Sequence, residues 1–203
     1  MWIKICGMTT QEAVAAALEA RVDAIGFVFA DSPRQLAPPA ASLLAQPARG
    51  RVRCVAVTRH PTQQALDEIL AAFKPDVLQT DAADLGMLRL PRQLELLPVL
   101  RGGDAEQASL PARLLFEGLA SGAGMPSDWA TARRIARRAQ LVLAGGLNAA
   151  NVASAIAEVQ PFGVDVSSGV EERRGVKSPA EIVRFVSAAR TSNRYSTAQK
   201  DPV

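Results

Sequence analysis

The chain has 203 residues, a formal net charge of +3, 48% hydrophobic residues and 4% aromatic residues. A chain of this length can bury one sizeable core, here mainly aliphatic, so we expect a single domain. Because the net charge is small and the arginines are spread out, we expect no nucleic-acid partner. One cluster indicates either a solvated helix face or a basic binding patch: Arg133, Arg134, Arg137 and Arg138.

The cysteines and the histidine define the expected redox and metal chemistry. Two cysteines, Cys6 and Cys54, and one histidine, His60, form neither a disulfide framework nor a recognisable zinc motif. Cys54 lies inside an apolar segment and is expected in the core. The chain shows no signal-peptide pattern and no apolar run of about 18 residues. We therefore predict a reduced, cytoplasmic protein with no metal site and no membrane partner.

Eight apolar segments of strand length alternate with helical patterns along the chain. This alternation predicts a compact, single-domain (β/α)8 barrel over residues 1–190, with an open, doubly wound sheet as the alternative. Residues 191–203 are polar and are expected to form a disordered tail. The predicted strands are 2–5, 24–29, 52–57, 76–78, 96–100, 114–116, 141–143 and 162–166. The predicted helices are 11–20, 39–44, 61–73, 84–91, 127–138, 149–158 and 179–189.

In such a barrel, the chemistry is expected in the turns that follow the strands. The last two strands run into turns rich in glycine and serine. Such turns after strands seven and eight commonly bind a phosphate group, because free N–H groups and helix dipoles favour an anion. Glycine is also common in tight turns that bind nothing. We predict that these two turns bind phosphate, through Gly145, Gly146, Ser167, Ser168 and Gly169.

An ordered set of motifs resembles phosphoribosylanthranilate isomerase over residues 3 to 185. The motifs are Lys4-Ile5-Cys6-Gly7, the segment 24–29 with Ser32-Pro33-Arg34, the segments 143–148 and 163–171, and Gly175-Val176-Lys177. The resemblance implies a small (β/α)8 barrel without metal or organic cofactor. It also implies an Amadori rearrangement in tryptophan biosynthesis, from N-(5-phosphoribosyl)anthranilate to 1-(2-carboxyphenylamino)-1-deoxyribulose 5-phosphate.

The same resemblance implies roles for particular side chains. Cys6 is the general base, Glu117 the general acid, Arg34 a ligand of the anthranilate carboxylate, and Asp165 a residue near the ribose. A free thiol is mostly protonated at neutral pH, so we expect the site to lower the pKa of Cys6. Lys4 lies two residues earlier on the same strand face, where its ammonium stabilises the thiolate or forms a plain salt bridge in the barrel.

The chain departs from the family pattern at two strand ends. Glu117 stands where the family has an aspartate, and Asp81 stands where it usually has a histidine. Two alternative functions stay open. One is another phosphosugar barrel enzyme, such as an indole-glycerol-phosphate synthase or an epimerase. The other is a catalytically weak paralogue that binds a phosphosugar or serves as a partner subunit. We expect a monomer or a homodimer.

Overall fold

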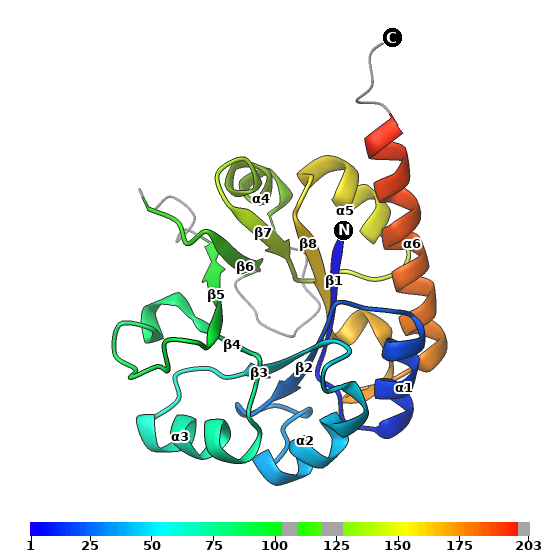
Figure 1. The fold of residues 1–203 in the computed structure, drawn as a ribbon. Coiled ribbons are helices and arrows are strands. Elements are labelled where there is room, and N and C mark those ends of the chain that lie inside the picture. Colours follow the sequence, from blue (N-terminus) through cyan, green and yellow to red (C-terminus); the bar gives the residue numbers. More distant parts are fainter. Residues whose placement is uncertain (103–108, 119–127, 199–203) are drawn as a thin grey trace.

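A computed structural model describes residues 1–102, 109–118 and 128–198 and contains a closed barrel of eight parallel strands paired in chain order (Figure 1). The predicted (β/α)8 architecture is therefore confirmed, and the open sheet is excluded. Each predicted strand is present, with ends that differ by a few residues. The strands are β1 (Trp2–Cys6), β2 (Ala24–Val28), β3 (Arg53–Val57), β4 (Val77–Asp81), β5 (Glu95–Arg101), β6 (Arg113–Glu117), β7 (Gln140–Leu143) and β8 (Gly163–Val166).

The helices lie outside the strand ring (Figure 1). They are α1 (Gln11–Glu19), α2 (Pro38–Ala45), α3 (Gln63–Ala72), α4 (Trp129–Ala136), α5 (Val152–Val159) and α6 (Pro179–Ala198), with short 3₁₀ turns η1 (Gln46–Ala48), η2 (Ala82–Asp84) and η4 (Ser168–Val170). Local capping explains two of the starts: the Thr10 hydroxyl accepts the Ala13 N–H at 3.2 Å, and Thr62 does the same for Ala65. No helix in the described ranges combines the length and apolar composition that a membrane span requires.

Two predicted helices differ from the structure. The predicted helix at 84–91 is absent, and only the turn η2 follows β4 there. Gly86 and Pro91 make a helix unfavourable in this segment. The last helix, in contrast, continues to Ala198, so residues 191–198 are helical where we predicted a disordered tail. The hydroxyls of Thr191 and Ser192 donate to carbonyls one turn earlier, at 3.0 and 3.1 Å, and so fit within the helix. The remaining predicted tail, 199–203, lies outside the described residues.

Two hydrophobic clusters follow from the alternation of side chains along the strands. A small cluster fills the barrel interior and includes Val55, Leu97 and Val142. A larger cluster packs the outer faces of the strands against the helices. Cys54 belongs to this outer cluster, as predicted, and burial raises its pKa to about 11, so its thiol is unreactive. The interior face carries the polar groups at the carboxyl ends of the strands.

Candidate active site

The first polar group at the carboxyl ends of the strands is the buried thiol of Cys6, the last residue of β1. Its neighbour on β2 is Gly26, paired with it in register. A Cβ atom added at Gly26 would lie 3.1 Å from the Cys6 sulfur and 3.2 Å from the Lys4 Cε. The glycine therefore leaves space for both side chains. An isolated glycine inside a strand indicates such a close approach, but the packing role of Gly26 was not predicted from the sequence.

Lys4 connects β1 to β8 inside the barrel. Its Nζ donates to Asp165 Oδ1 at 2.8 Å, and both side chains are almost fully buried. Burial lowers the pKa of Lys4, but the charges of Asp165 and Cys6 outweigh this effect and the net pKa lies above its ordinary value. Lys4 is therefore a buried cation. It forms the salt bridge with Asp165, and its charge also lowers the pKa of the Cys6 thiol, so the structure contains both interactions considered for Lys4.

The pKa of Cys6 moves in the direction opposite to the prediction. Burial raises it, the ammonium of Lys4 lowers it, Asp165 raises it and Lys177 lowers it, and the net pKa lies above the ordinary value. The expectation of a lowered pKa is wrong because desolvation of the thiolate exceeds the stabilisation by two nearby cations. A thiolate formed here is consequently a stronger base than an exposed one.

Arg34 is held by a carboxylate that the sequence analysis did not single out. Its Nε and Nη2 donate to the two carboxylate oxygens of Glu171 at 2.6 and 2.9 Å. Glu171 also accepts from Lys177 Nζ at 2.7 Å and from the Gly175 N–H at 3.1 Å. Burial raises the pKa of Glu171, but the hydrogen bonds from Arg34 and Lys177 outweigh burial and lower the pKa to about 2. Glu171 is therefore ionised and orients Arg34.

A small hairpin after β8 carries this carboxylate, and it was also missed in the sequence. Its strands are β9 (Glu171–Arg173) and β10 (Val176–Lys177). Gly175 at its tip has a φ of 85°, and a Cβ there would lie 2.7 Å from the Pro33 carbonyl oxygen. The Thr9 hydroxyl donates to the Gly175 carbonyl at 2.7 Å. The hairpin thus packs between the turns that follow β1 and β2, next to Arg34.

Glu117 ends β6, and its side chain is 12% exposed, so it is not a surface glutamate. Its Oε1 accepts a hydrogen bond from Arg101 Nη2 at 2.6 Å. Arg101 ends β5 and contacts Asp81 at the end of β4 through Nη1. One guanidinium therefore joins the two positions at which the chain departs from the family pattern. Residues 119–127, which follow this strand end, lie outside the described residues.

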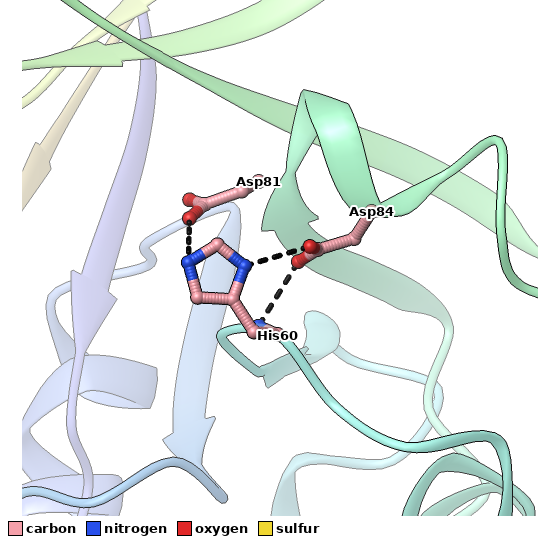
Figure 2. Close-up of side chains that lie close together, drawn as sticks. All are labelled: His60, Asp81 and Asp84. Carbon is pink, nitrogen blue, oxygen red and sulfur yellow. Dashed lines mark hydrogen bonds and ion pairs between the residues drawn. The ribbon is translucent and has the colours of Figure 1, made fainter.

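His60 completes this side of the barrel mouth, and Figure 2 shows its ring between two carboxylates. Nδ1 lies 2.8 Å from Asp84 Oδ1, and Nε2 lies 3.3 Å from Asp81 Oδ2. Asp84 also accepts the His60 N–H at 3.0 Å and the Thr80 hydroxyl at 2.7 Å. Burial raises the pKa of Asp84, but the hydrogen bonds from His60 and Thr80 outweigh it and the pKa lies below its ordinary value.

The same three side chains contain the atoms of a possible cation site. One ligand atom each from His60, Asp81 and Asp84 lies within 4.8 Å of the others. The two ring nitrogens of His60, however, face different carboxylates, and a single ion can bind only one of them. The arrangement is that of an imidazole hydrogen-bonded to Asp84 through Nδ1, with Nε2 facing Asp81. We therefore interpret the cluster as an arrangement in which Asp84 fixes His60, and His60 in turn fixes the position of the Asp81 carboxylate.

The predicted phosphate-binding turns follow β7 and β8 and pack against each other. Gly145 and Gly146 have φ values of 92° and 64°, which favour glycine. A Cβ atom at Gly169 would overlap the Leu147 carbonyl oxygen, so glycine allows the two turns to meet. The Asn151 side chain donates to the Gly146 carbonyl at 2.8 Å. The glycines thus allow the backbones of the two turns to pack closely against each other.

Two polar residues of these turns, Ser167 and Asn148, make hydrogen bonds within the protein. Ser167 Oγ donates to the Cys6 carbonyl at 3.1 Å, and Lys177 Nζ lies 3.2 Å from the same hydroxyl. Ser167 therefore connects the turn to β1, whereas Ser168 opens the short turn η4. Asn148 Oδ1 accepts from the Ala150 and Asn151 N–H groups at 2.9 and 3.1 Å, one turn before α5.

The closed parallel barrel, with its reactive side chains at the carboxyl ends of the strands, defines the class: this is a (β/α)8-barrel enzyme. The sequence model of one family, N-(5'-phosphoribosyl)anthranilate (PRA) isomerase, matches residues 3–188. The chain belongs to this family. A protein of Rhizobium etli named N-(5'-phosphoribosyl)anthranilate isomerase is 38% identical over 210 residues, which cover 94% of this chain and 95% of the relative.

Solved structures agree with this assignment. TrpF from Jonesia denitrificans is 36% identical, with a TM-score of 0.79 over 95% of this chain and 98% of its own. A phosphoribosyl anthranilate isomerase in complex with reduced 1-(o-carboxyphenylamino)-1-deoxyribulose 5-phosphate is 26% identical, with a TM-score of 0.77 over 94% and 99%. The dimeric isomerase of Thermotoga maritima, solved as monomers, is 28% identical, with a TM-score of 0.81 over the same shares.

Proposed function

We propose that this protein is an isomerase of tryptophan biosynthesis that converts N-(5-phosphoribosyl)anthranilate to 1-(2-carboxyphenylamino)-1-deoxyribulose 5-phosphate. Membership of the family supports the reaction. The observation that carries the proposal is the buried thiol of Cys6 beside the Lys4–Asp165 ion pair at the end of β1. An Amadori rearrangement requires an acid and a base, and the barrel has Cys6 and Glu117 at the carboxyl ends of two different strands, β1 and β6.

The reaction needs one acid and one base. Glu117 gives a proton to the furanose ring oxygen, the C1′–O bond breaks, and the anthranilate nitrogen forms a Schiff base with C1′. The Cys6 thiolate then removes the C2′ proton, and the resulting enolamine tautomerises to the ketone. The buried ammonium of Lys4 counters the charge of the thiolate at the moment of proton removal. The raised pKa of Cys6 makes the thiolate basic enough to take a carbon-bound proton.

Arg34 is proposed to bind the anthranilate carboxylate. Glu171 occupies the Nε–Nη2 edge of its guanidinium. Within the described ranges Nη1 makes no hydrogen bond, so the other edge can pair with a second carboxylate in two-point geometry. The Cδ of Arg34 packs over Gly7, the residue that follows Cys6, where a Cβ would lie only 2.5 Å away.

The sugar phosphate is proposed to bind at the turns after β7 and β8. Gly145, Gly146, Ser168 and Gly169 offer backbone N–H groups at two turns that face one another. Ser167 is proposed to bind the phosphate as well, and its hydroxyl, which donates a hydrogen bond to the Cys6 carbonyl, joins this turn to β1. Asp165 lies on β8 and accepts a hydrogen bond from Lys4, and it is proposed to contact the ribose.

A catalytically weak paralogue, which binds a phosphosugar or serves as a partner subunit, is the second candidate. One observation favours it: the ion pair between Arg101 and Glu117 stabilises the carboxylate over the acid that the reaction needs. The two candidates differ in turnover. The isomerase consumes freshly made phosphoribosylanthranilate, measured as loss of anthranilate fluorescence, whereas a weak paralogue binds the reduced product analogue with no rate above that of the Cys6→Ser variant.

The proposal also covers the domain organisation, the oligomeric state, the cellular location and the absence of cofactors, and two of these points can be tested directly. The barrel is a single catalytic domain, proposed to span residues 1–190, and it works as a monomer or a homodimer in the cytoplasm. It requires no cofactor, no nucleic acid and no membrane. Light scattering of the purified protein gives the oligomeric state. Dialysis against a chelator should leave the rate unchanged.

A further inference from the structure

The guanidinium of Arg101 is shared by two carboxylates from the strands on either side of it. Register places Arg101 opposite Glu117 on β6, and places Asp81 of β4 opposite Val99, two residues earlier on the same face of β5. Nη2 donates to Glu117 at 2.6 Å and Nη1 contacts Asp81. The three side chains are between 10% and 17% exposed. They form a row across three neighbouring strand ends, partly shielded from water.

Asp81 is itself held in place from the side away from Arg101. The imidazole of His60 lies 3.3 Å from its Oδ2 and is 63% exposed. His60 has a φ of 47°, in the left-handed region, and Asp84 holds it through both the backbone N–H and Nδ1 (Figure 2). A continuous series of contacts therefore runs from His60 at the surface, through Asp81 and Arg101, to Glu117.

One cation between two carboxylates has a defined electrostatic consequence. If Arg101 paired with Glu117 alone, two N–H groups on one edge of the guanidinium would donate to the Glu117 carboxylate. Such two-point pairing would keep Glu117 ionised. Asp81 takes one of these N–H groups, and its negative charge disfavours a second ionised carboxylate nearby. Both effects increase the proton affinity of Glu117. Among the charged groups of the described residues, Arg101 from β5 contacts both carboxylates, and His60 lies beyond Asp81.

We propose that Asp81 is a positioning residue that keeps Glu117 able to carry a proton, because it holds Arg101 towards β4 and adds a negative charge. The proposal rests on the proposed function, in which Glu117 is the acid. It links the two departures from the family pattern, at the ends of β4 and β6, into one unit. His60 acts on Glu117 only through Asp81.

The first test measures the protonation of Glu117 without turnover. The side-chain carboxyl carbon of Glu117, assigned with Glu117→Gln, is titrated by ¹³C NMR in the wild type and in Asp81→Asn. Removal of one nearby negative charge should shift the titration midpoint down by about one pH unit. Asp31→Asn, at an exposed position in the turn after β2, is the matched control and should leave the midpoint unchanged. If Asp81→Asn does not fold, Asp81→Ser serves as the second neutral variant, and Asp81→Glu should restore the wild-type midpoint.

The second test uses the pH profile of kcat. Activity falls at alkaline pH when the acid loses its proton, so this limb should move to lower pH in Asp81→Asn by the same amount as the NMR midpoint. A purely structural role of Asp81 would lower kcat at every pH without moving the limb. An unchanged or raised midpoint in Asp81→Asn overturns the inference, whatever the rate. If the wild type shows no turnover, the proposed function fails, and the NMR titration alone still decides how Asp81 acts on Glu117.

Discussion

Replacement of Glu171 by glutamine tests the network that orients Arg34. The side chain of Glu171 is 6% exposed and accepts hydrogen bonds from Arg34, Lys177 and the Gly175 N–H. The substitution keeps the size of the side chain and removes its charge, so that two nearly buried cations lose their counter-ion. We expect the variant to fold and to be less stable.

The magnitude follows from the pKa of Glu171. Its folded-state value of about 2 lies below the ordinary 4.5, so the ionised group contributes stability that is fully present above about pH 4.5 and is lost as the pH falls towards 2. The difference between the two pKa values corresponds to about 3 kcal/mol at pH 7. By the same linkage, about 1 kcal/mol is left at pH 3.

The assay is urea unfolding followed by circular dichroism at pH 7, 5, 4 and 3. The free energy of unfolding of Glu171→Gln should lie about 3 kcal/mol below that of the wild type at pH 7, and the gap should narrow between pH 4.5 and 3. The matched control is Glu172→Gln, at the exposed neighbouring position, which should change stability by less than about 0.5 kcal/mol. A gap that does not depend on pH would refute the assigned pKa and the role of the ionised carboxylate.

Three further predictions concern catalysis and can share one control, Gly86→Ala, because a Cβ at Gly86 meets nothing within 4 Å. Cys6→Ser and Glu117→Gln should each lower kcat by about two to four orders of magnitude, and near-full kcat in either variant would remove that residue from the acid–base pair. Gly26→Ala should lower kcat more than it raises KM, because its Cβ would press on the Cys6 sulfur; a change in KM alone would contradict this reading. Gly169→Ala should separate the two phosphate turns and weaken inhibition by inorganic phosphate, and unchanged inhibition would place the phosphate elsewhere.

Much of the fold could be predicted because the signals are local. Continuous apolar segments between capped helices specify strands that are covered on both faces, and each predicted strand is found in the barrel. The errors lie where local signals are weak or compete. Polar residues such as Thr191 look like a tail but satisfy their hydroxyls within α6. The hairpin β9–β10 has strands of only three and two residues, too short for any periodic pattern.

The site was predictable in its backbone positions and less so in its electrostatics. Cys6 and the glycine turns were placed correctly, because a strand end followed by glycine is recognisable in the chain. The direction of the pKa change at Cys6 was wrong, because a nearby Lys4 is visible in the sequence whereas full burial of the thiol is not. Arg101 was missed because it directly follows the apolar segment 96–100 and carries no motif.

The sequence by itself therefore determined the barrel, the strand ends that form the site and the family to which the chain belongs. The tertiary structure alone decided which charges share a partner. Lys4 and Asp165 are 161 residues apart and meet where the first and last barrel strands pair, and Arg34 and Glu171 are 137 residues apart and meet where the hairpin after β8 reaches the turn after β2. Ion pairing falls steeply with distance and rises with burial, and both quantities arise only when the barrel closes.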